Sequence, residues 1–240
     1  MNKDKYTRLL PIEGAYNVRD LGGYPTKDGK QVKWKKLLRS GDLNELTLQD
    51  LNYLKDIPVI TDIDFRSFQE KEAAPDKRME SLKEYVWLPV DAGDMNDIKI
   101  TDVTLIPKMM EEAYRTIIRK FQNEYKRFFE ILINRQAAPL LFHCSAGKDR
   151  TGIAAALLLS ALGVDKETVM QDYLLSAEYI KGKYDFLIRM QPALEPLTTV
   201  RPEYLEAALQ VIDKEFGGME QFLHRNLNVD SEKLKELYTE

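Results

Sequence analysis

Residues 143–152 constrain the fold of this chain more than any other segment: they read His143-Cys144-Ser145-Ala146-Gly147-Lys148-Asp149-Arg150-Thr151-Gly152. The apolar residues 139–142 before the segment predict a short buried strand, and residues 153–162 after it predict a buried helix. A loop that joins a strand to a helix N-terminus brings several backbone N–H groups to one point, where they can bind an anion. The segment therefore predicts an α/β fold with an anion site at one edge of its sheet.

Two side chains in this loop have the chemistry of covalent catalysis. Cys144 is the single cysteine of the chain, and five residues separate it from Arg150. A free thiol is mostly protonated at neutral pH, but a nearby arginine and a helix N-terminus lower its pKa and make it a nucleophile. The planar fork of Arg150 matches two oxygens of a phosphoryl group, which a lysine cannot do. We expect Cys144 and Arg150 to be catalytic.

The other loop residues are expected to shape the anion site. Gly147 and Gly152 allow the backbone to approach a ligand closely. The Thr151 hydroxyl can donate a hydrogen bond to the sulfur, and His143 is expected to brace the loop through backbone hydrogen bonds. The predicted phosphate-binding residues are Ser145, Ala146, Gly147, Lys148, Asp149 and Arg150.

The simplest alternative is that Cys144 is only a small buried apolar residue at the end of a strand. A cysteine and an arginine at this spacing can also occur by chance. The preceding His143, the glycines, Thr151 and the strand–helix context together favour the functional interpretation.

The loop resembles the signature H-C-x-A-G-K-D-R-T-G of a bacterial tyrosine phosphatase family. Members are described as atypical dual- or triple-specificity enzymes that act on phosphoproteins and phosphoinositides. The resemblance extends over nearly the whole chain, although Phe65 replaces the usual leucine. Besides the loop, the matching segments are residues 17–23 (NVRDLGG), 38–41 (LRSG), 64–70 (DFRSFQE), 172–176 (DYLLS) and 201–205 (RPEYL).

The resemblance implies a three-layer α/β fold of the cysteine-phosphatase type, with a central, mostly parallel sheet flanked by helices and a helical C-terminal part. We expect one phosphatase domain over residues 1–240, with a core at about 10–165 and the helical part at about 166–240. The periodicity predicts strands over residues 59–65 and 85–90 and a helix over residues 47–54. Residues 104–134 are predicted to form a long helix in two pieces.

A phosphoryl transfer of this kind also needs a group that gives a proton to the leaving oxygen. Asp91 follows the strand 85–90, so it should emerge at the same sheet edge as Cys144, and Gly93 could give its loop mobility. Asp94 and Asp97 are expected to be solvated turn residues. Asp149 lies in the loop itself, where it either carries the proton or pairs with Arg66 or Lys148. The position of Asp91 favours it as the acid.

Lys148 bears on the substrate class, since a lysine in such a loop resembles phosphoinositide phosphatases. Ser145 stands where the most committed 3-phosphoinositide enzymes have a second lysine, and Asp149 cancels part of the charge. A protein-tyrosine phosphatase whose activity can extend to phosphoinositides and phosphoserine or phosphothreonine therefore fits best. The alternatives are a dedicated phosphoinositide phosphatase and a catalytically weak phosphate-binding module. An arsenate reductase would need further cysteines, and a sulfurtransferase has no need of Arg150 and Thr151.

Three arginines outside the loop are open to two interpretations. Each could line the mouth of the site, or could be a buried structural partner of an acidic residue close to it in the sequence. For Arg19 and Arg66 the adjacent acidic residues favour a structural role, with Arg66 supporting the site. The partners considered for Arg19, Arg39 and Arg66 are Asp20, Asp42 and Glu70.

Composition limits the partners and the compartment. The net charge of −4 and the pI of about 5.5 argue against nucleic acid as a main partner. The chain has no apolar run near the roughly 18 residues of a membrane span, and its first residues lack the apolar segment of a signal peptide. A single cysteine cannot form an internal disulfide, which fits the cytoplasm, although unconventional secretion leaves no mark in a sequence. We expect phosphate and vanadate as ligands, and no metal or cofactor.

Overall fold

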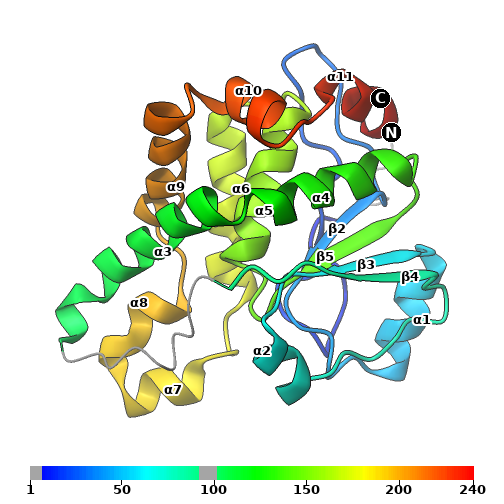
Figure 1. Cartoon of the computed structure of the whole chain (residues 1–240). Helices are drawn as coiled ribbons and strands as arrows, with labels where there is room; N and C mark the ends of the chain where they lie inside the picture. The colour runs from blue at the N-terminus through cyan, green and yellow to red at the C-terminus, as the bar shows by residue number, and fades with distance from the viewer. Residues whose placement is uncertain (1–6, 92–101) are drawn as a thin grey trace.

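The computed structural model describes residues 7–91 and 102–240, and its centre is a mixed sheet (Figure 1). Within the described residues the sheet has five strands in the order β1, β2, β5, β3, β4. β2, β5, β3 and β4 run parallel, and β1 pairs antiparallel with β2 at one edge. The strands are β1 (Arg19–Asp20), β2 (Leu37–Ser40), β3 (Thr61–Asp64), β4 (Glu84–Trp87) and β5 (Leu140–His143).

Helices surround this sheet and make up most of the second half of the chain. The longer ones are α1 (Leu48–Asp56), α3 (Ile106–Lys120), α4 (Gln122–Asn134), α5 (Arg150–Ala161), α6 (Lys166–Tyr179), α9 (Pro202–Glu215) and α11 (Ser231–Tyr238). The short ones are α2 (Phe68–Ala73), η1 (Val103–Leu105), α7 (Asp185–Met190), η2 (Pro192–Leu194), α8 (Glu195–Thr198), α10 (Met219–Gln221) and η3 (Phe222–Asn226).

Local sequence fixes where the first two helices begin. Thr47 caps α1 by accepting a hydrogen bond from the Asp50 N–H, and the Asp50 carboxylate accepts one from the Thr47 N–H in return. Ser67 and Glu70 form the same reciprocal arrangement at the start of α2. Each pair satisfies N–H groups that a helix N-terminus otherwise leaves without partners.

Successive side chains of the buried strands point to opposite faces of the sheet, so the apolar core lies in two layers, one on each face. Leu140 and Phe142 of β5 belong to the larger apolar cluster, which includes residues of α3, α4, α5, α6 and α9. Leu141 faces the opposite side and joins a smaller cluster with Leu54 of α1 and Val18. Successive side chains of a strand point to opposite faces, so each face of β5 is buried under a different layer. The predicted three-layer arrangement is confirmed.

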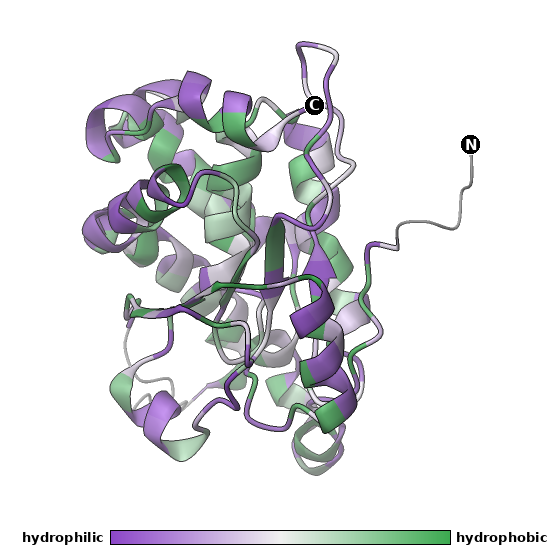
Figure 2. Cartoon of the chain, turned by 90° about the vertical axis from the view of Figure 1, so that its right-hand side faces the viewer, coloured by the Kyte–Doolittle hydropathy of each residue, from purple (hydrophilic) through white to green (hydrophobic). Residues whose placement is uncertain are grey.

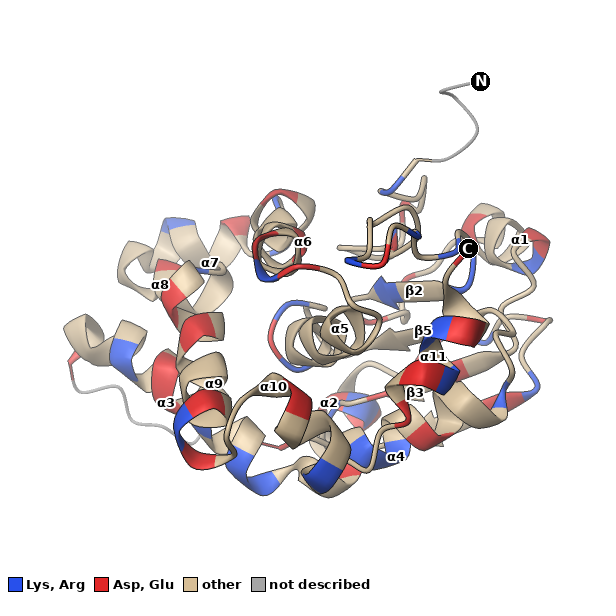
Figure 3. Ribbon diagram, turned by 90° about the horizontal axis from the view of Figure 1, so that it is seen from above, with Lys and Arg blue, Asp and Glu red and all other residues tan. Residues whose placement is uncertain are grey.

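The helix that follows the loop runs through the middle of the molecule. Ten of the twelve residues of α5 are buried, and its charged residue, Arg150, stands at its beginning. Seen from above, α5 is almost free of charged residues, whereas outer helices such as α4 carry both signs (Figure 3). The outer helices also show hydrophilic and hydrophobic faces (Figure 2). The most apolar helix therefore holds the loop from within the core.

The C-terminal helices pack on the core. α9 lies along α3, α6 along α5, and α11 contacts both α4 and α5. A single phosphatase domain over residues 1–240 stays a prediction. The predicted long helix in two pieces is confirmed, because Phe121 separates α3 from α4. Gly93, Asp94 and Asp97 lie outside the described residues. Among the described helices, none has the length and apolarity that crossing a membrane requires.

Candidate active site

The loop from Cys144 to Asp149 joins the end of β5 to the start of α5, as predicted. β5 lies between β2 and β3 and runs parallel to both. The carboxyl ends of these three strands therefore meet beside the loop, which is where open α/β sheets bind ligands. The dipole of α5 points its positive end at the same place.

Hydrogen bonds from outside hold the loop carbonyls. The Ser145 carbonyl accepts from the Asp42 N–H at 3.2 Å, and the Asn17 side-chain amide donates to the carbonyls of Ala146 and Gly147 at 3.2 and 2.9 Å. The C=O and N–H of one peptide group point in opposite directions. Because these carbonyls point outward to their hydrogen-bond donors, the N–H groups of the same peptides point toward the inside of the loop. The backbone is thus arranged to receive an anion.

Gly147 is the loop residue whose identity the backbone requires. It has a positive φ of 66°, which side chains with a Cβ rarely adopt. A Cβ at this position would lie 2.4 Å from the Ser40 carbonyl oxygen of β2. Any other residue would have to displace the loop or the strand beside it.

Two buried arginines, Arg19 and Arg39, form a hydrogen-bonded network with Asp172 that supports the loop. Asp172 of α6 accepts hydrogen bonds from Arg19 Nε at 3.0 Å and from Arg39 at 2.6 Å, and Arg39 also donates to the Gly147 carbonyl at 2.7 Å. Arg19 further contacts the side chain of Asn17. Burial alone would raise the pKa of Asp172, but the two arginines outweigh it and lower the pKa to about 2.

This network corrects the partners that the sequence suggested. Arg19 was expected to be structural, and it is fully buried, but it pairs with Asp172 rather than Asp20. Arg39 also pairs with Asp172 and not with Asp42, whose partner is Lys183. The reason is the fold: α6 carries Asp172 beneath the loop, while the acidic neighbours in sequence bind elsewhere.

Cys144 lies at the base of the loop and is 1% exposed. Burial by itself would raise the pKa of the thiol, and the charge of Asp149 adds to that effect. The positive charge of Arg150 and the hydroxyl and N–H of Thr151 outweigh both and lower the pKa below its ordinary value. Thr151 Oγ1 is buried without an oxygen or nitrogen partner among the described residues, so it remains available to the sulfur.

The guanidinium of Arg150 is held by a residue that the sequence assigned elsewhere. Glu70 of α2 binds it through two hydrogen bonds, NH1 to Oε2 at 2.6 Å and NH2 to Oε1 at 2.7 Å. The Ser145 hydroxyl donates to the same carboxylate at 2.5 Å. Burial would raise the pKa of Glu70, but Arg150 and Ser145 lower it to about 2. Glu70 was considered as a partner of Arg66, and this interpretation was wrong.

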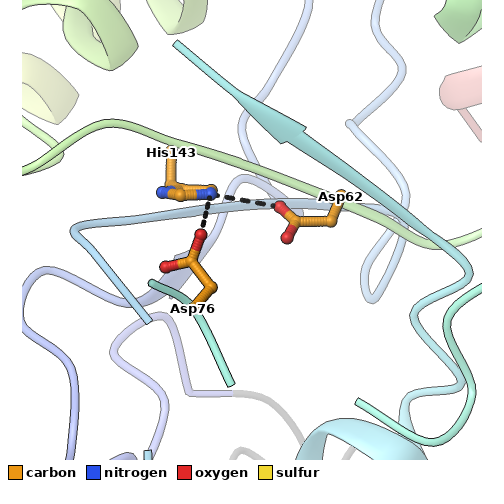
Figure 4. A group of neighbouring side chains, drawn as sticks. All are labelled: Asp62, Asp76 and His143. Carbon is orange, nitrogen blue, oxygen red and sulfur yellow. Dashed lines mark ion pairs between the residues drawn. The ribbon is translucent and has the colours of Figure 1, made fainter. Parts of the chain in front are cut away.

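His143, which precedes Cys144, lies among three carboxylates, and Figure 4 shows two of them, those of Asp62 and Asp76. On β5 it shares a face with Asp62 and Asp64 of β3, because Asp64 is its register partner and side chains alternate. Its Nε2 is 3.3 Å from Asp62 Oδ1 and 3.6 Å from Asp76 Oδ2. Burial would lower the pKa of His143, but the carboxylates outweigh it and raise the pKa to about 10. His143 is therefore an imidazolium at neutral pH.

The predicted role of His143 was incomplete. The contact from its Nδ1 to the Cys144 carbonyl is long at 3.4 Å, and Asp62 lies closer, 3.3 Å from Nε2. The donor atoms of Asp62, Asp76 and His143 lie within 4.8 Å of one another, a distance at which they could hold a metal ion. We interpret the group as ion pairs, because the imidazolium already supplies the positive charge.

Arg66 supplies a second cation to this group. It donates to Asp64 from Nε at 3.0 Å and from NH2 at 2.8 Å, and it also contacts Asp76. Both carboxylates face His143. Arg66 is thus a buried structural residue, as the sequence favoured. It binds the same carboxylates, Asp64 and Asp76, that lie near His143.

Asp149 and Lys148 bind each other at the end of the loop. Lys148 Nζ lies 2.8 Å from Asp149 Oδ1 and 2.7 Å from Oδ2, and the lysine side chain is 3% exposed. The Tyr114 hydroxyl of α3 donates to Asp149 Oδ1 at 2.6 Å. Of the two partners considered for Asp149, Lys148 is correct and Arg66 is not. The charge of Lys148 is thus balanced within the loop.

Asp91 lies on the surface, at the edge of the sheet where the loop after β5 begins. It follows Val90, whose N–H donates to the Phe65 carbonyl at 3.1 Å, and the Phe65 N–H in turn donates to the His143 carbonyl at 2.9 Å. The expected sheet edge is therefore correct. Asp91 is exposed, whereas Asp149 is largely covered.

A large hollow of the molecule lies away from this chemistry. It has a volume of about 850 Å³ and is lined by Ala161 and Gly163, at the opposite end of α5 from Arg150. No residue of the loop lines it. We therefore place the candidate active site at the loop, where Cys144, Arg150 and the N-terminus of α5 meet.

Comparison with known proteins identifies the family. A protein of Cupriavidus necator that carries the provisional name of a tyrosine-protein phosphatase is 34% identical over 95% of this chain and 88% of its own length. The triple specificity protein phosphatase PtpB of Mycobacterium tuberculosis is 29% identical over 90% of this chain and 92% of its own.

Among solved structures, a cysteine-to-serine variant of TpbA from P. aeruginosa, in complex with pTyr, has a TM-score of 0.33 and 17% identity. The match covers 64% of this chain and 83% of the TpbA chain. The family model described as the tyrosine phosphatase family matches residues 10–240, and the chain belongs to that family.

Proposed function

We propose that this enzyme hydrolyses phosphate monoesters, with phosphotyrosine in proteins as its main substrate, through a phosphocysteine intermediate. The observation that carries the proposal is the placement of Cys144 and Arg150 in one loop at the start of α5, with the pKa of the thiol lowered. The name of PtpB, a triple specificity protein phosphatase, supports a protein substrate.

In the first step the phosphoryl group lies in the loop, and the inward N–H groups donate to its oxygens. A guanidinium has five N–H groups, so Arg150 can bind phosphate while two of them bind Glu70. The sulfur of Cys144 forms a bond to phosphorus as the bond to the leaving oxygen breaks. The leaving oxygen takes a proton from an acid, which gives tyrosine and phosphocysteine.

In the second step a water molecule attacks phosphorus, and the acid of the first step accepts its proton. The S–P bond breaks, inorganic phosphate leaves, and the sulfur becomes a thiolate again. The buried Thr151 hydroxyl can donate to that departing sulfur. Arg150 and the loop N–H groups stabilise the negative charge in both steps.

We propose Asp149 as the proton carrier, in place of the Asp91 that the sequence favoured. Asp149 lies close enough to Cys144 and Arg150 for its charge to shift the pKa of both. Asp91 remains the alternative carrier, because it lies at the same sheet edge.

The surroundings of Lys148 favour phosphotyrosine over a dedicated phosphoinositide substrate. Its ammonium group is buried against Asp149, so its charge is compensated before any substrate binds. We infer that phosphoinositides and phosphoserine or phosphothreonine are secondary substrates. We further propose phosphate and vanadate as ligands of the loop, and the cytoplasm as the compartment, where the lone cysteine would stay reduced.

The covalent step is tested by acid quenching with a ³²P-labelled phosphotyrosine peptide. Wild type should trap radiolabel on Cys144, which peptide mapping locates, and Cys144→Ser should trap none and lose turnover. The same variant should still bind vanadate or phosphate, because the loop N–H groups are unchanged. Label at another residue, or turnover by Cys144→Ser within tenfold of wild type, would exclude the mechanism.

The substrate class is tested by comparing kcat/KM on phosphotyrosine peptides, phosphoserine peptides and phosphoinositide vesicles. We expect the phosphotyrosine peptide to be the best substrate. A phosphoinositide preferred by tenfold or more would instead make this chain a dedicated lipid phosphatase.

A further inference from the structure

Two large aromatic side chains are exposed together beside the carboxyl ends of β3 and β4. Phe68, the first residue of α2, is 57% exposed, and Trp87, the last residue of β4, is 38% exposed. Their ring centroids are 6.4 Å apart. The Lys71 ammonium lies 4.3 Å from the centroid of the Trp87 ring and 5.9 Å from that of the Phe68 ring. We call Phe68, Lys71 and Trp87 the aromatic cluster.

The aromatic cluster is held in place by hydrogen bonds around it. The indole Nε1 of Trp87 donates to the Arg66 carbonyl at 2.8 Å. The capping box of α2 fixes the backbone from which Phe68 projects. Single apolar side chains on a surface are ordinary, but apolar side chains that are exposed as a group mark sites of interaction. Tryptophan is also enriched among the residues that contribute most to binding.

The register of the sheet places the aromatic cluster beside the phosphate-binding loop. Trp87 of β4 is the register partner of Asp64 of β3, and Asp64 is the register partner of His143 of β5. Neighbouring strands lie about 4.8 Å apart, so the backbones of Trp87 and His143 are about 10 Å apart. The nucleophile, Cys144, directly follows His143.

The start of α2 joins the aromatic cluster to the catalytic arginine. Phe68 is two residues before Glu70, whose carboxylate binds the Arg150 guanidinium at 2.6 and 2.7 Å. The first turn of α2 therefore contacts the loop through Glu70 and carries an exposed aromatic ring at its first residue. The aromatic cluster is thus continuous with the candidate active site.

The spacing fits a peptide that extends from the active site. An extended chain spans about 3.3 to 3.6 Å per residue, so about 10 Å corresponds to about three residues. A peptide whose phosphotyrosine enters the loop can therefore place a side chain two or three positions away on the rings of Phe68 and Trp87. The Lys71 ammonium has three N–H donors, so it can also bind a carboxylate of that peptide while it contacts the rings.

We propose that the aromatic cluster binds the segment of a protein substrate that flanks the phosphotyrosine, with an apolar side chain on the two rings and an acidic side chain against Lys71. The inference deepens the proposed function and rests on a protein as the substrate. Binding energy gained at flanking residues raises kcat/KM on peptides, whereas a small phosphate ester has no atoms that reach the aromatic cluster.

The test measures kcat/KM of the full-length enzyme on a series of phosphotyrosine peptides. The reference peptide has alanine at positions −3 to +3 around the phosphotyrosine, and each further peptide has leucine at one of these positions. We expect leucine at a position two or three residues from the phosphotyrosine to raise kcat/KM about tenfold, as a well-packed apolar contact does. Each value is divided by that of the same enzyme on p-nitrophenyl phosphate, so that effects on the loop or on folding cancel.

Variants of Phe68 connect this gain to the aromatic cluster. Phe68→Ala should lose the gain from leucine, and Phe68→Tyr, which keeps a ring, should retain most of it. Leu48→Ala is the matched control, because Leu48 is 75% exposed and is the first residue of its helix, α1, as Phe68 is of α2. This control should show the same gain as wild type.

The charge of Lys71 is tested with glutamate in place of leucine in the peptide series. Wild type should prefer glutamate over alanine near the leucine position, and this preference should weaken with added salt, because salt screens exposed charges. Lys71→Gln should lose the preference, and Lys71→Arg should keep it. An unchanged preference in Lys71→Gln would overturn the role of Lys71.

The results separate this inference from the proposed function. If the peptides are hydrolysed but leucine gives no gain, or the gain persists in Phe68→Ala, the inference is wrong and the proposed function stands. If p-nitrophenyl phosphate is hydrolysed and no phosphotyrosine peptide is, the protein substrate is excluded and the inference with it. A loss in Phe68→Ala that is confined to phosphoinositide vesicles would assign the aromatic cluster to a membrane surface and overturn the peptide as its occupant.

Discussion

Glu70 and Arg150 are 80 residues apart in sequence and form a two-armed ion pair, with nitrogen–oxygen distances of 2.6 and 2.7 Å. Glu70 is the third residue of α2, and Arg150 is the first of α5. The same carboxylate closes the capping box of α2 through the Ser67 N–H at 2.8 Å. Glu70, at the start of α2, thus fixes the plane of the Arg150 guanidinium at the start of α5.

Glu70→Gln should reduce activity through Arg150. The amide cannot accept two charge-assisted hydrogen bonds, so the guanidinium loses its fixed plane. We expect kcat/KM on p-nitrophenyl phosphate to fall on the order of 10- to 100-fold, since such losses follow small misplacements of catalytic groups. Glu72→Gln, on the same helix, is the control and should stay near wild type. A Glu70→Gln enzyme within twofold of wild type would mean that Arg150 needs no orienting partner.

Arg150→Lys should be severely impaired although the charge is kept. Lysine is a point charge and cannot bind two phosphoryl oxygens in one plane, nor bind Glu70 through two nitrogens. We expect a loss in kcat of about 100-fold or more, comparable to removal of a donor from an oxyanion hole. Steady-state kinetics measure it, with vanadate affinity as the check on binding. Near wild-type turnover would exclude Arg150 as the group that stabilises the transition state.

The proton carrier can be identified from leaving-group dependence. Asp149→Asn should lose much more activity on alkyl phosphates than on p-nitrophenyl phosphate, because p-nitrophenolate leaves with little need of a proton. Asp91→Asn should lose similar, small amounts on both substrates. The reverse pattern would make Asp91 the acid, and equal losses on all substrates in both variants would place the acid elsewhere.

His143 should make stability fall as the pH rises. Its pKa in the folded protein is about 10, above the ordinary 6.5, so its stabilisation is complete below pH 6.5 and is lost as the pH approaches 10. Within that window the slope contributed by one such group is about 1.4 kcal/mol per pH unit. Urea unfolding at pH 6, 8 and 9.5 should show this loss in wild type and a flatter profile in His143→Gln.

The second histidine of the chain supplies the control for this measurement. His224 is exposed, so His224→Gln removes a histidine without touching the carboxylates around His143. Its stability should follow the wild-type dependence on pH. Equal slopes in His143→Gln and wild type would mean that His143 is neutral in the folded protein.

The sequence by itself determined the local structure of the site. The residues after Pro139 form the strand, those from Arg150 form the helix, and the loop lies between them as the motif predicts. The helix starts at Thr47 and Ser67 follow from capping residues three positions apart. These features could be predicted because each depends on neighbours within a few residues along the chain.

Only the tertiary structure decided which charges meet. Arg39 and Asp172 are 133 residues apart, and Arg19 and Asp172 are 153 apart, yet they pair beneath the loop. Acidic residues close in sequence, such as Asp20 and Asp42, bind other groups. A buried ion needs its partner at hydrogen-bonding distance in space, and that distance is set by how α6, α2 and the sheet pack against one another. For Arg19 and Arg39, sequence spacing carries no information about that distance, whereas the adjacent residues Lys148 and Asp149 do pair as the sequence suggested.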